Sequence, residues 1–233
     1  MSRWDTIRVG DSDMPIYVGE PDGEGPYPAI VLTFHRGGMD SFTMESVDRL
    51  AAAGFLTVAP DFYHRKKGIA PEKAVKFRLD EDVISDIRAT VDHIDSLKSA
   101  NPSLMAIMGH CMGGRTAYLG ASVLSDRFKL CLPFYSGGAF SPWGEGPSVF
   151  DRFGDLKSIV YGFYGNDDKN PSPADVDKFD ARLTELGVEH KFYRYEGAGH
   201  AFQNTVNREN YRPKQSEDAW EKVIRHLKDH LLS

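Results

Sequence analysis

The sequence has few cysteines, no long apolar run and no block of basic residues. Its 233 residues include two cysteines, Cys111 and Cys131. A chain of this length can bury a core without disulfide bonds, so we expect both thiols to be free and the protein to reside in the reducing cytoplasm. No apolar stretch is long enough to cross a bilayer, and the first residues lack the apolar segment of a secretory signal. We therefore expect neither membrane insertion nor export.

The charge balance is mildly acidic and argues against a nucleic-acid partner. The chain carries 28 lysines and arginines against 34 aspartates and glutamates, a formal net charge of -6. Because the basic residues form no cluster, the sequence lacks the positive surface that nucleic acid requires. We expect a small-molecule partner, and the sequence leaves the oligomeric state open. A hydrophobic fraction of 41% supplies one sizeable core, which predicts a single domain over residues 1–233.

Short apolar runs alternate with segments of helical period along the chain. The apolar runs predict strands at residues 29–34, 55–59, 104–108, 129–134, 158–163 and 189–195. Apolar residues at helical spacing predict helices around residues 44–51, 83–97, 115–119, 176–186 and 220–231. This alternation predicts an α/β fold with a mostly parallel central sheet and helices on both faces.

A cysteine flanked by glycines follows one of these predicted strands. The segment Gly109-His110-Cys111-Met112-Gly113 comes directly after the apolar residues 104–108. Small residues on both sides allow the tight strand-to-helix turn called a nucleophile elbow, here with sulfur in place of the usual serine oxygen. The alternative is a core cysteine that packs as a small hydrophobe. The glycines, the preceding strand and the helix-compatible residues that follow favour a nucleophile.

Two further loops at strand ends carry an acid and a histidine. They are Tyr164-Gly165-Asn166-Asp167-Asp168 and Glu196-Gly197-Ala198-Gly199-His200, and the carboxyl ends of parallel strands are where binding sites form. A thiol attacks as thiolate, so it needs an imidazole to take its proton and a carboxylate to orient that imidazole. Cysteine, acid and histidine follow the chain order of this hydrolase architecture. We predict His200 as the base and Asp168 as its partner, with Asp167 as the competing carboxylate. The alternative for His200 is an exposed loop histidine, and the alternative for Asp168 is an aspartate that caps the following helix.

Several of these segments together resemble the dienelactone hydrolase family. They are the elbow Gly109–Gly114, the acid loop Gly165–Asp168, the histidine loop Gly197–Phe202, and the residues Arg49–Phe55 and Ala59–Tyr63. The resemblance runs from about Pro28 to the C-terminal helix. It implies an α/β-hydrolase fold, a Cys-Asp-His triad, and neither metal nor organic cofactor. The family's type reaction opens an unsaturated lactone ring through an acyl-thioester intermediate. Carried over, Cys111 is the nucleophile, His200 is base and then acid, and Asp168 orients His200.

The same architecture predicts an oxyanion hole. The backbone N–H of Met112, directly after the nucleophile, and that of Arg36, in the loop after the strand 29–34, are expected to converge on the developing oxyanion. If this loop does not form an oxyanion hole, the pair Gly37-Gly38 in it is simply a flexible turn.

The chain departs from the family pattern at two positions. The family has a glutamate that helps to activate the thiol, and this sequence has His35 there. A histidine can exchange a proton, stabilise a thiolate as a cation, or only line the pocket wall. The family also has an arginine shortly after the triad histidine, which binds the substrate carboxylate, and this sequence has Asn204 in that vicinity. Arg78 either replaces part of that charge or is a solvated surface group, so dienelactone itself is not the expected substrate.

Two aromatic residues are further candidates for the pocket. Tyr135 begins the loop Tyr135-Ser136-Gly137-Gly138, which could floor a pocket, and Trp143 is either an apolar wall or an ordinary packed tryptophan. The sequence thus predicts a cofactor-independent hydrolase of a small ester or lactone. A thioesterase or acyl transferase would use the same triad, and a hydrolase-fold protein can also bind a small ligand without turnover. The eight histidines form no zinc-type ligand cluster with Cys111, and the sequence assigns no role to Cys131.

Overall fold

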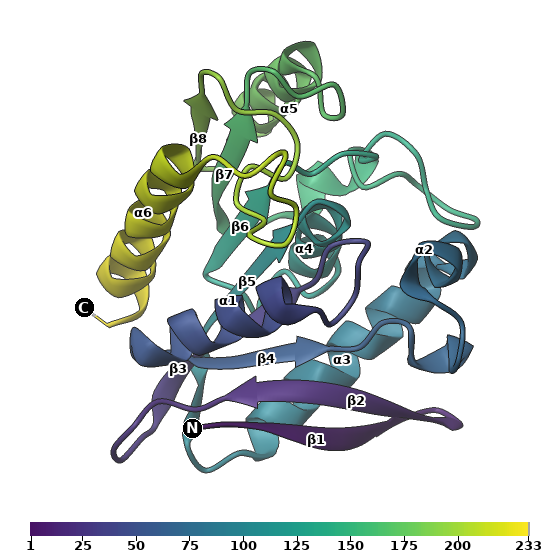
Figure 1. Ribbon diagram of the computed structural model, residues 1–233, viewed down its shortest axis with the longest axis vertical. Helices are drawn as coiled ribbons and strands as arrows, with labels where there is room; N and C mark the ends of the chain where they lie inside the picture. The colour runs from purple at the N-terminus through teal and green to yellow at the C-terminus, as the bar shows by residue number, and fades with distance from the viewer. Residues whose placement is uncertain (233) are drawn as a thin grey trace.

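The computed structural model describes residues 1–232, and an eight-stranded sheet lies at the centre of this part of the chain. Its strands are β1 (Ser2–Val9), β2 (Ser12–Gly19), β3 (Tyr27–Thr33), β4 (Leu56–Pro60), β5 (Ala100–His110), β6 (Leu130–Phe134), β7 (Ile159–Gly165) and β8 (His190–Tyr195). They lie in the order β1-β2-β4-β3-β5-β6-β7-β8 from one end of the molecule to the other (Figure 1). The long helices are α1 (Ser41–Ala52), α3 (Asp80–Ser96), α4 (Met112–Val123), α5 (Pro173–Glu185) and α6 (Pro213–Leu231). Short turns of helix, α2 (Pro71–Ala74), η1 (His64–Lys66), η2 (Val75–Phe77) and η3 (Asp151–Asp155), lie in the connections.

The sheet is mostly parallel. The strands from β3 to β8 pair in parallel, whereas β1 and β2 form an antiparallel hairpin that joins the sheet along β4. The predicted α/β-hydrolase fold is therefore confirmed, and each predicted strand overlaps one strand of the parallel part. The hairpin is an addition to the prediction. In strand β1 only Val9 is buried. A strand that is mostly exposed needs no apolar run, so the pattern of apolar runs did not predict it.

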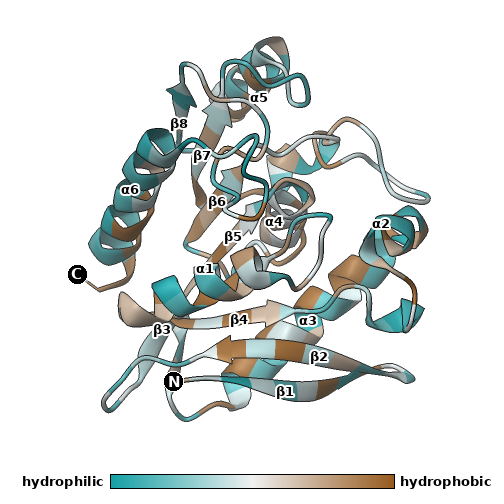
Figure 2. Ribbon diagram, in the orientation of Figure 1, coloured by the Kyte–Doolittle hydropathy of each residue, from teal (hydrophilic) through white to brown (hydrophobic). Residues whose placement is uncertain are grey.

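Helices cover both faces of the sheet, and each face has its own apolar core. On one face, buried residues of α3, α4 and α5, among them Ile87, Tyr118 and Phe179, pack against the strands. On the other face, α1 and α6 contribute Leu50 and Val223. In Figure 2 the helix α6 is brown along one side and teal along the other, which is the pattern of a helix that covers a core. Between residues 1 and 232, no helix combines the length and the apolar character needed to span a membrane.

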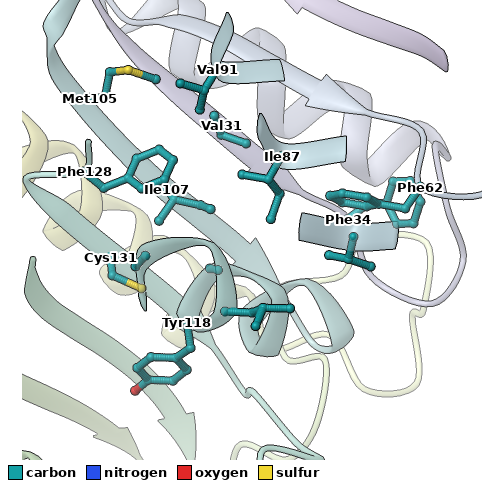
Figure 3. Close-up of a cluster of buried hydrophobic side chains, with 14 of the residues drawn as sticks. Val31, Phe34, Phe62, Ile87, Val91, Met105, Ile107, Tyr118, Phe128 and Cys131 are labelled. Atoms are coloured by element: carbon teal, nitrogen blue, oxygen red, sulfur yellow. The ribbon is translucent and has the colours of Figure 1, made fainter. Parts of the chain in front are cut away.

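Cys131 belongs to the core. It lies on β6 close to Ile107 and Tyr118 (Figure 3), and its side chain is fully buried. Burial raises the pKa of its thiol. Because a buried neutral thiol is a poor nucleophile, Cys131 fills space and is chemically inert.

The parallel strands bring four loops to one edge of the sheet. Cys111 follows β5, Asp168 follows β7 and His200 follows β8, and the loop that holds Arg36 follows β3. Strands β3 and β5 are direct neighbours, with Thr33 paired to Gly109. The topology therefore places these residues at the edge where α/β sheets bind their ligands.

Candidate active site

Cys111 occupies the turn between β5 and α4 in a strained backbone conformation. Its φ is 58° and its ψ is -119°, a region that a residue with a side chain adopts only where its surroundings hold it. The neighbouring glycines are required by close packing. A Cβ atom on Gly113 would lie 2.0 Å from the carbonyl oxygen of Thr33, and one on Gly109 would lie 2.0 Å from Thr33 Oγ1. This is the nucleophile-elbow geometry, pressed against the adjacent strand β3.

Three side chains from different strand ends form one continuous chain of contacts. Nε2 of His200 lies 3.0 Å from Sγ of Cys111, and Nδ1 lies 2.9 Å from Oδ2 of Asp168. Asp168 is buried, and its Oδ1 accepts a hydrogen bond from the backbone N–H of Asn170 at 2.9 Å. The competing acid, Asp167, is exposed. The carboxylate in contact with His200 is therefore Asp168.

The contact between sulfur and imidazole shifts the pKa values of both groups. Burial alone raises the pKa of Cys111 and lowers that of His200, because each charged form loses its hydration. Hydrogen bonding and charge outweigh burial in both cases. The imidazolium lowers the pKa of Cys111 below its ordinary value, and Asp168 and the thiolate raise the pKa of His200 to about 10. Both shifts favour the pair of thiolate and imidazolium, and the thiolate is the nucleophilic form.

Two backbone N–H groups face the sulfur. Those of Met112 and Arg36 both stabilise the thiolate and so contribute to the lowered pKa of Cys111. The loops that carry them are bridged by Tyr63, whose Oη donates to the Arg36 carbonyl at 3.0 Å and lies 3.5 Å from Met112 Sδ. A negative charge that develops beside the sulfur would meet the same two donors, which is the arrangement of an oxyanion hole.

A cavity of about 490 Å³ opens beside Cys111. It is lined by Arg36, Glu72, Val75, Lys76, Arg78, Cys111, Met112, Gly137, Gly138, Trp143, Asn170 and His200. Three arginine and lysine side chains against one glutamate make this cavity basic, although the whole chain carries a net charge of -6. Its size suits a small molecule. Within residues 1–232, no three histidine, cysteine, aspartate or glutamate side chains gather in a way that could hold a metal ion.

Comparison with known proteins agrees with this geometry. The profile of the Dienelactone hydrolase family matches residues 14–231. The chain belongs to the dienelactone hydrolase family. A protein of Synechocystis sp. named "Putative carboxymethylenebutenolidase" is 30% identical over 220 residues, which cover 89% of this chain and 88% of that relative. The resemblance predicted from the sequence is confirmed, and the protein is a hydrolase of this family.

Solved structures show the same fold over the whole chain. A "Putative Dienelactone Hydrolase" from Klebsiella pneumoniae superposes with a TM-score of 0.88 at 22% identity, covering 97% of this chain and 98% of that one. A dienelactone hydrolase-like promiscuous phosphotriesterase from metagenomic libraries gives 0.85 at 16% identity, covering 99% and 98%. At these identities the likeness establishes the shared fold.

The His35 side chain points into its own loop. Its Nε2 lies 2.9 Å from Asp40 Oδ2, and its Nδ1 accepts a hydrogen bond from the backbone N–H of Gly37 at 3.2 Å. Asp40 in turn caps α1 by accepting from the backbone N–H of Thr43. Both ring nitrogens of His35 are thus engaged, and among the described residues His35 is not part of the cavity wall. Its ring is turned toward Asp40, and the activating and pocket-lining roles considered for His35 stay predictions.

Arg78 and Trp143 do line the cavity, and they stack on each other. The central guanidinium carbon of Arg78 lies 3.7 Å from the Trp143 ring centroid, and Arg78 Nε donates to the Val75 carbonyl at 3.0 Å. Burial lowers the pKa of Arg78 to about 10, so the side chain is still a cation at neutral pH. Its Nη1 is buried and has no hydrogen-bond partner within residues 1–232. A cationic donor of this kind beside Cys111 is suited to an anionic group on a ligand.

Tyr135 and Asn204 take supporting positions. The Tyr135 ring packs edge-on against His200, with centroids 5.1 Å apart, and its φ of 33° is in the left-handed region. The ring is buried, and Gly137 and Gly138 of the same loop line the cavity, so a role of Tyr135 in substrate binding stays a prediction. Asn204 Oδ1 accepts from the backbone N–H groups of Val206 and Asn207, which ties it into its own loop.

Two residues next to this site were not indicated by the sequence analysis. They are Asp80, the first residue of α3, and Arg115, in the first turn of α4, and they form a buried ion pair behind Trp143. The available signal was Arg115 itself, the single charged residue of the largely buried helix α4. A lone arginine on a buried helix requires a partner.

Proposed function

We propose that this protein hydrolyses a small carboxylic ester or lactone by covalent catalysis at Cys111. The observation that carries the proposal is the unbroken contact from Asp168 through His200 to the sulfur, on a strained elbow. The fold alone would not support this proposal, since hydrolase folds also serve other functions. The pKa shifts that these contacts cause are in the direction that the first step needs, toward a thiolate and an imidazolium.

In the first half-reaction the thiolate of Cys111 attacks the substrate carbonyl carbon. The π electrons move to the carbonyl oxygen, whose negative charge is received by the backbone N–H groups of Met112 and Arg36. The C–O bond then breaks, and His200 donates its Nε2 proton to the leaving oxygen. The products are an acyl thioester on Cys111 and an alcohol, which remains attached to the acyl group when the substrate is a lactone.

In the second half-reaction water releases the acyl group. Neutral His200 accepts a proton from a water molecule as the water oxygen attacks the thioester carbonyl. The thiolate of Cys111 leaves, a carboxylic acid is released, and His200 is again an imidazolium. Asp168 accepts the Nδ1–H bond throughout and stabilises that cation. The cycle consumes one water molecule and restores each residue to its starting state.

The charge of the cavity supports an anionic substrate. Arg36, Lys76 and Arg78 outnumber Glu72 in its wall, and Arg78 is close enough to Cys111 for the two charges to interact. We propose that Arg78 binds a carboxylate on the substrate, a few ångströms from the carbonyl that reacts. The name printed for the Synechocystis relative, a carboxymethylenebutenolidase, describes a lactone with such a substituent and supports the same choice.

The test is incubation with a panel of aryl esters, lactones and thioesters, with and without a carboxylate, followed by mass spectrometry of the intact protein. We expect release of product and an acyl adduct on Cys111 that is absent from Cys111→Ala. The matched control is Cys131→Ala, which removes the inert core thiol and should keep both signals.

Three outcomes would contradict the proposal. The first is the absence of both turnover and adduct with every substrate, which would leave a ligand-binding role. The second is unchanged turnover in Cys111→Ala. The third is acyl transfer to an added alcohol or amine in place of water, which would identify an acyl transferase.

A further inference from the structure

Asp80 and Arg115 form a bidentate ion pair that is separate from the contacts among Cys111, His200 and Asp168. Arg115 Nη1 lies 2.6 Å from Asp80 Oδ1, and Nη2 lies 2.9 Å from Oδ2. The Arg115 side chain is 0% exposed and that of Asp80 is 8% exposed. A buried pair of this kind contributes little net stability compared with apolar residues of the same size. Its role is therefore better judged from the segments to which it is hydrogen-bonded.

The pair holds a segment of the cavity wall. Arg115 Nε donates to the Gly138 carbonyl at 3.1 Å, and Arg115 Nη2 donates to the Ser141 carbonyl at 2.9 Å. At the other end, the backbone N–H of Trp143 donates to Asp80 Oδ2 at 3.0 Å, and the backbone N–H of Asp80 donates to the Trp143 carbonyl at 2.8 Å. Residues 138–143 are thus fixed to the ion pair at both ends, and Gly138 and Trp143 both line the cavity.

Trp143 connects this ion pair to Arg78. The central guanidinium carbons of Arg115 and of Arg78 each lie 3.7 Å from the Trp143 ring. The charge of Arg115 is matched by Asp80, whereas Arg78 has no ion-pair partner within residues 1–232. The stack therefore keeps an unpaired cation at a fixed place in the wall next to Cys111. Stacking uses the face of the guanidinium, Nε is bonded to the Val75 carbonyl and Nη1 is buried, so Nη2 is the nitrogen left for a carboxylate.

We propose that Asp80, Arg115 and Trp143 are positioning residues that set the preference of this site for anionic substrates by fixing Arg78. The inference rests on the function proposed above and adds the residues that determine its specificity. Without the indole, Arg78 regains rotamer freedom, and binding a carboxylate must then order that side chain again. The loss should fall on substrates that carry the charge and spare neutral ones.

The test compares two esters that differ in one group, p-nitrophenyl butyrate and the mono-p-nitrophenyl ester of succinic acid, in which a carboxylate replaces the terminal methyl. We expect Trp143→Leu to lower the kcat/KM ratio of the anionic over the neutral ester about tenfold, through KM of the anionic ester, with kcat little changed. Arg78→Met should lower the ratio similarly. The double variant should lose no more than Arg78→Met alone, because Trp143 acts through Arg78.

Two variants control for structural damage. Trp4→Leu removes an exposed tryptophan of β1, 50% exposed, and should leave the ratio unchanged. Arg115→Met leaves a buried carboxylate unpaired and can unfold the chain, so the pair is tested as Asp80→Asn with Arg115→Gln, which removes both charges together and leaves no buried charge unpaired. In that variant, with its fold verified by circular dichroism, the ratio should fall as it does in Trp143→Leu.

The inference is overturned if Trp143→Leu changes both esters by the same factor, as a mere wall residue would, or if its effect adds to that of Arg78→Met. In either case hydrolysis of the neutral ester and acylation of Cys111 leave the proposed function standing. Failure of the proposed function is a different result: the wild type hydrolyses neither ester and gains no adduct on Cys111, and the inference then falls with it.

Discussion

His200 and Cys111 are 89 positions apart in the chain, yet His200 Nε2 lies 3.0 Å from Cys111 Sγ. At this distance the two groups share one proton, and each determines the charge of the other. The reactivity of the cysteine is therefore a property of the histidine loop, which makes the pair accessible to direct tests.

The first prediction concerns the pH dependence of Cys111 alkylation by iodoacetamide. Only the thiolate reacts, and the pKa of Cys111 is lowered, so the rate should persist below the range of an ordinary thiol and fall only as pH drops through that lowered value. His200→Ala removes the opposing charge and leaves burial, which raises the pKa. We expect its rate at pH 7 to fall about tenfold or more and its titration to move to higher pH. An unchanged profile in His200→Ala would place the activating group elsewhere.

The second prediction separates the two neighbouring aspartates. Asp168→Asn removes the charge that accepts the His200 Nδ1–H bond, and ester hydrolysis should fall about 100-fold or more. Asp167→Asn changes an exposed side chain and is the matched control, with activity within about twofold of wild type. Steady-state kinetics with an aryl ester measures both. Equal losses in the two variants would argue against Asp168 as the orienting carboxylate.

The third prediction concerns the alkaline limit of hydrolysis. The leaving oxygen needs the proton on His200, whose pKa is raised to about 10. The acylation rate should hold across neutral pH and decline as pH rises through about 10, because the imidazolium is then lost while the thiolate remains. The pH dependence of kcat for an alkyl ester, whose poor leaving group makes acylation rate-limiting, gives the measurement. An activated p-nitrophenyl ester is the control, since its leaving group requires little protonation and its decline should be weaker.

The fourth prediction concerns His35. Its ring contacts Gly37 and Asp40 within the loop that carries the Arg36 N–H. His35→Ala should lower kcat about tenfold by loosening that oxyanion donor, whereas His35→Gln offers one donor and one acceptor and should retain most activity. Because the Arg36 N–H also stabilises the thiolate, His35→Ala should move the alkylation profile of Cys111 to higher pH, by less than His200→Ala does. A shift as large as that of His200→Ala would instead assign His35 to thiol activation.

The fifth prediction concerns the buried Tyr135 hydroxyl, which has no hydrogen-bond partner within residues 1–232. Tyr135→Phe keeps the ring packed against His200 and removes an unsatisfied polar atom, so we expect kcat/KM within about twofold and stability unchanged or raised by about 1 kcal/mol. Urea denaturation and ester hydrolysis measure the two quantities. A large loss of activity would show that the hydroxyl takes part in the reaction.

The sequence was most informative where local spacing determines structure. Glycines around Cys111 predicted the elbow because Gly109 and Gly113 lie against Thr33 with no room for a Cβ atom. Apolar runs predicted the buried parallel strands, since such strands need apolar side chains on both faces. Strand β1 escaped this reasoning because it lies at the edge of the sheet and has a single fully buried residue.

The sequence was least informative about the direction in which a side chain points. Asp167 and Asp168 are adjacent, and only the path of the loop decides that Asp168 meets His200. His35 aligns with a catalytic position, yet its ring turns toward Asp40 because that residue caps the next helix. The stack of Arg78 on Trp143 joins residues 65 positions apart in the chain, so no local sequence pattern could predict it.

The pairing of Thr33 with Gly109 divides this enzyme into two parts that can change independently. Cys111 and the proposed oxyanion donors, the N–H groups of Met112 and Arg36, directly follow the neighbouring central strands β5 and β3. Arg78 and Trp143, which we propose recognise the substrate's charge, lie on connections outside the sheet. Exchanging those connections with the corresponding segments of relatives is therefore a route to new substrate selectivity that leaves the bond-breaking apparatus in place.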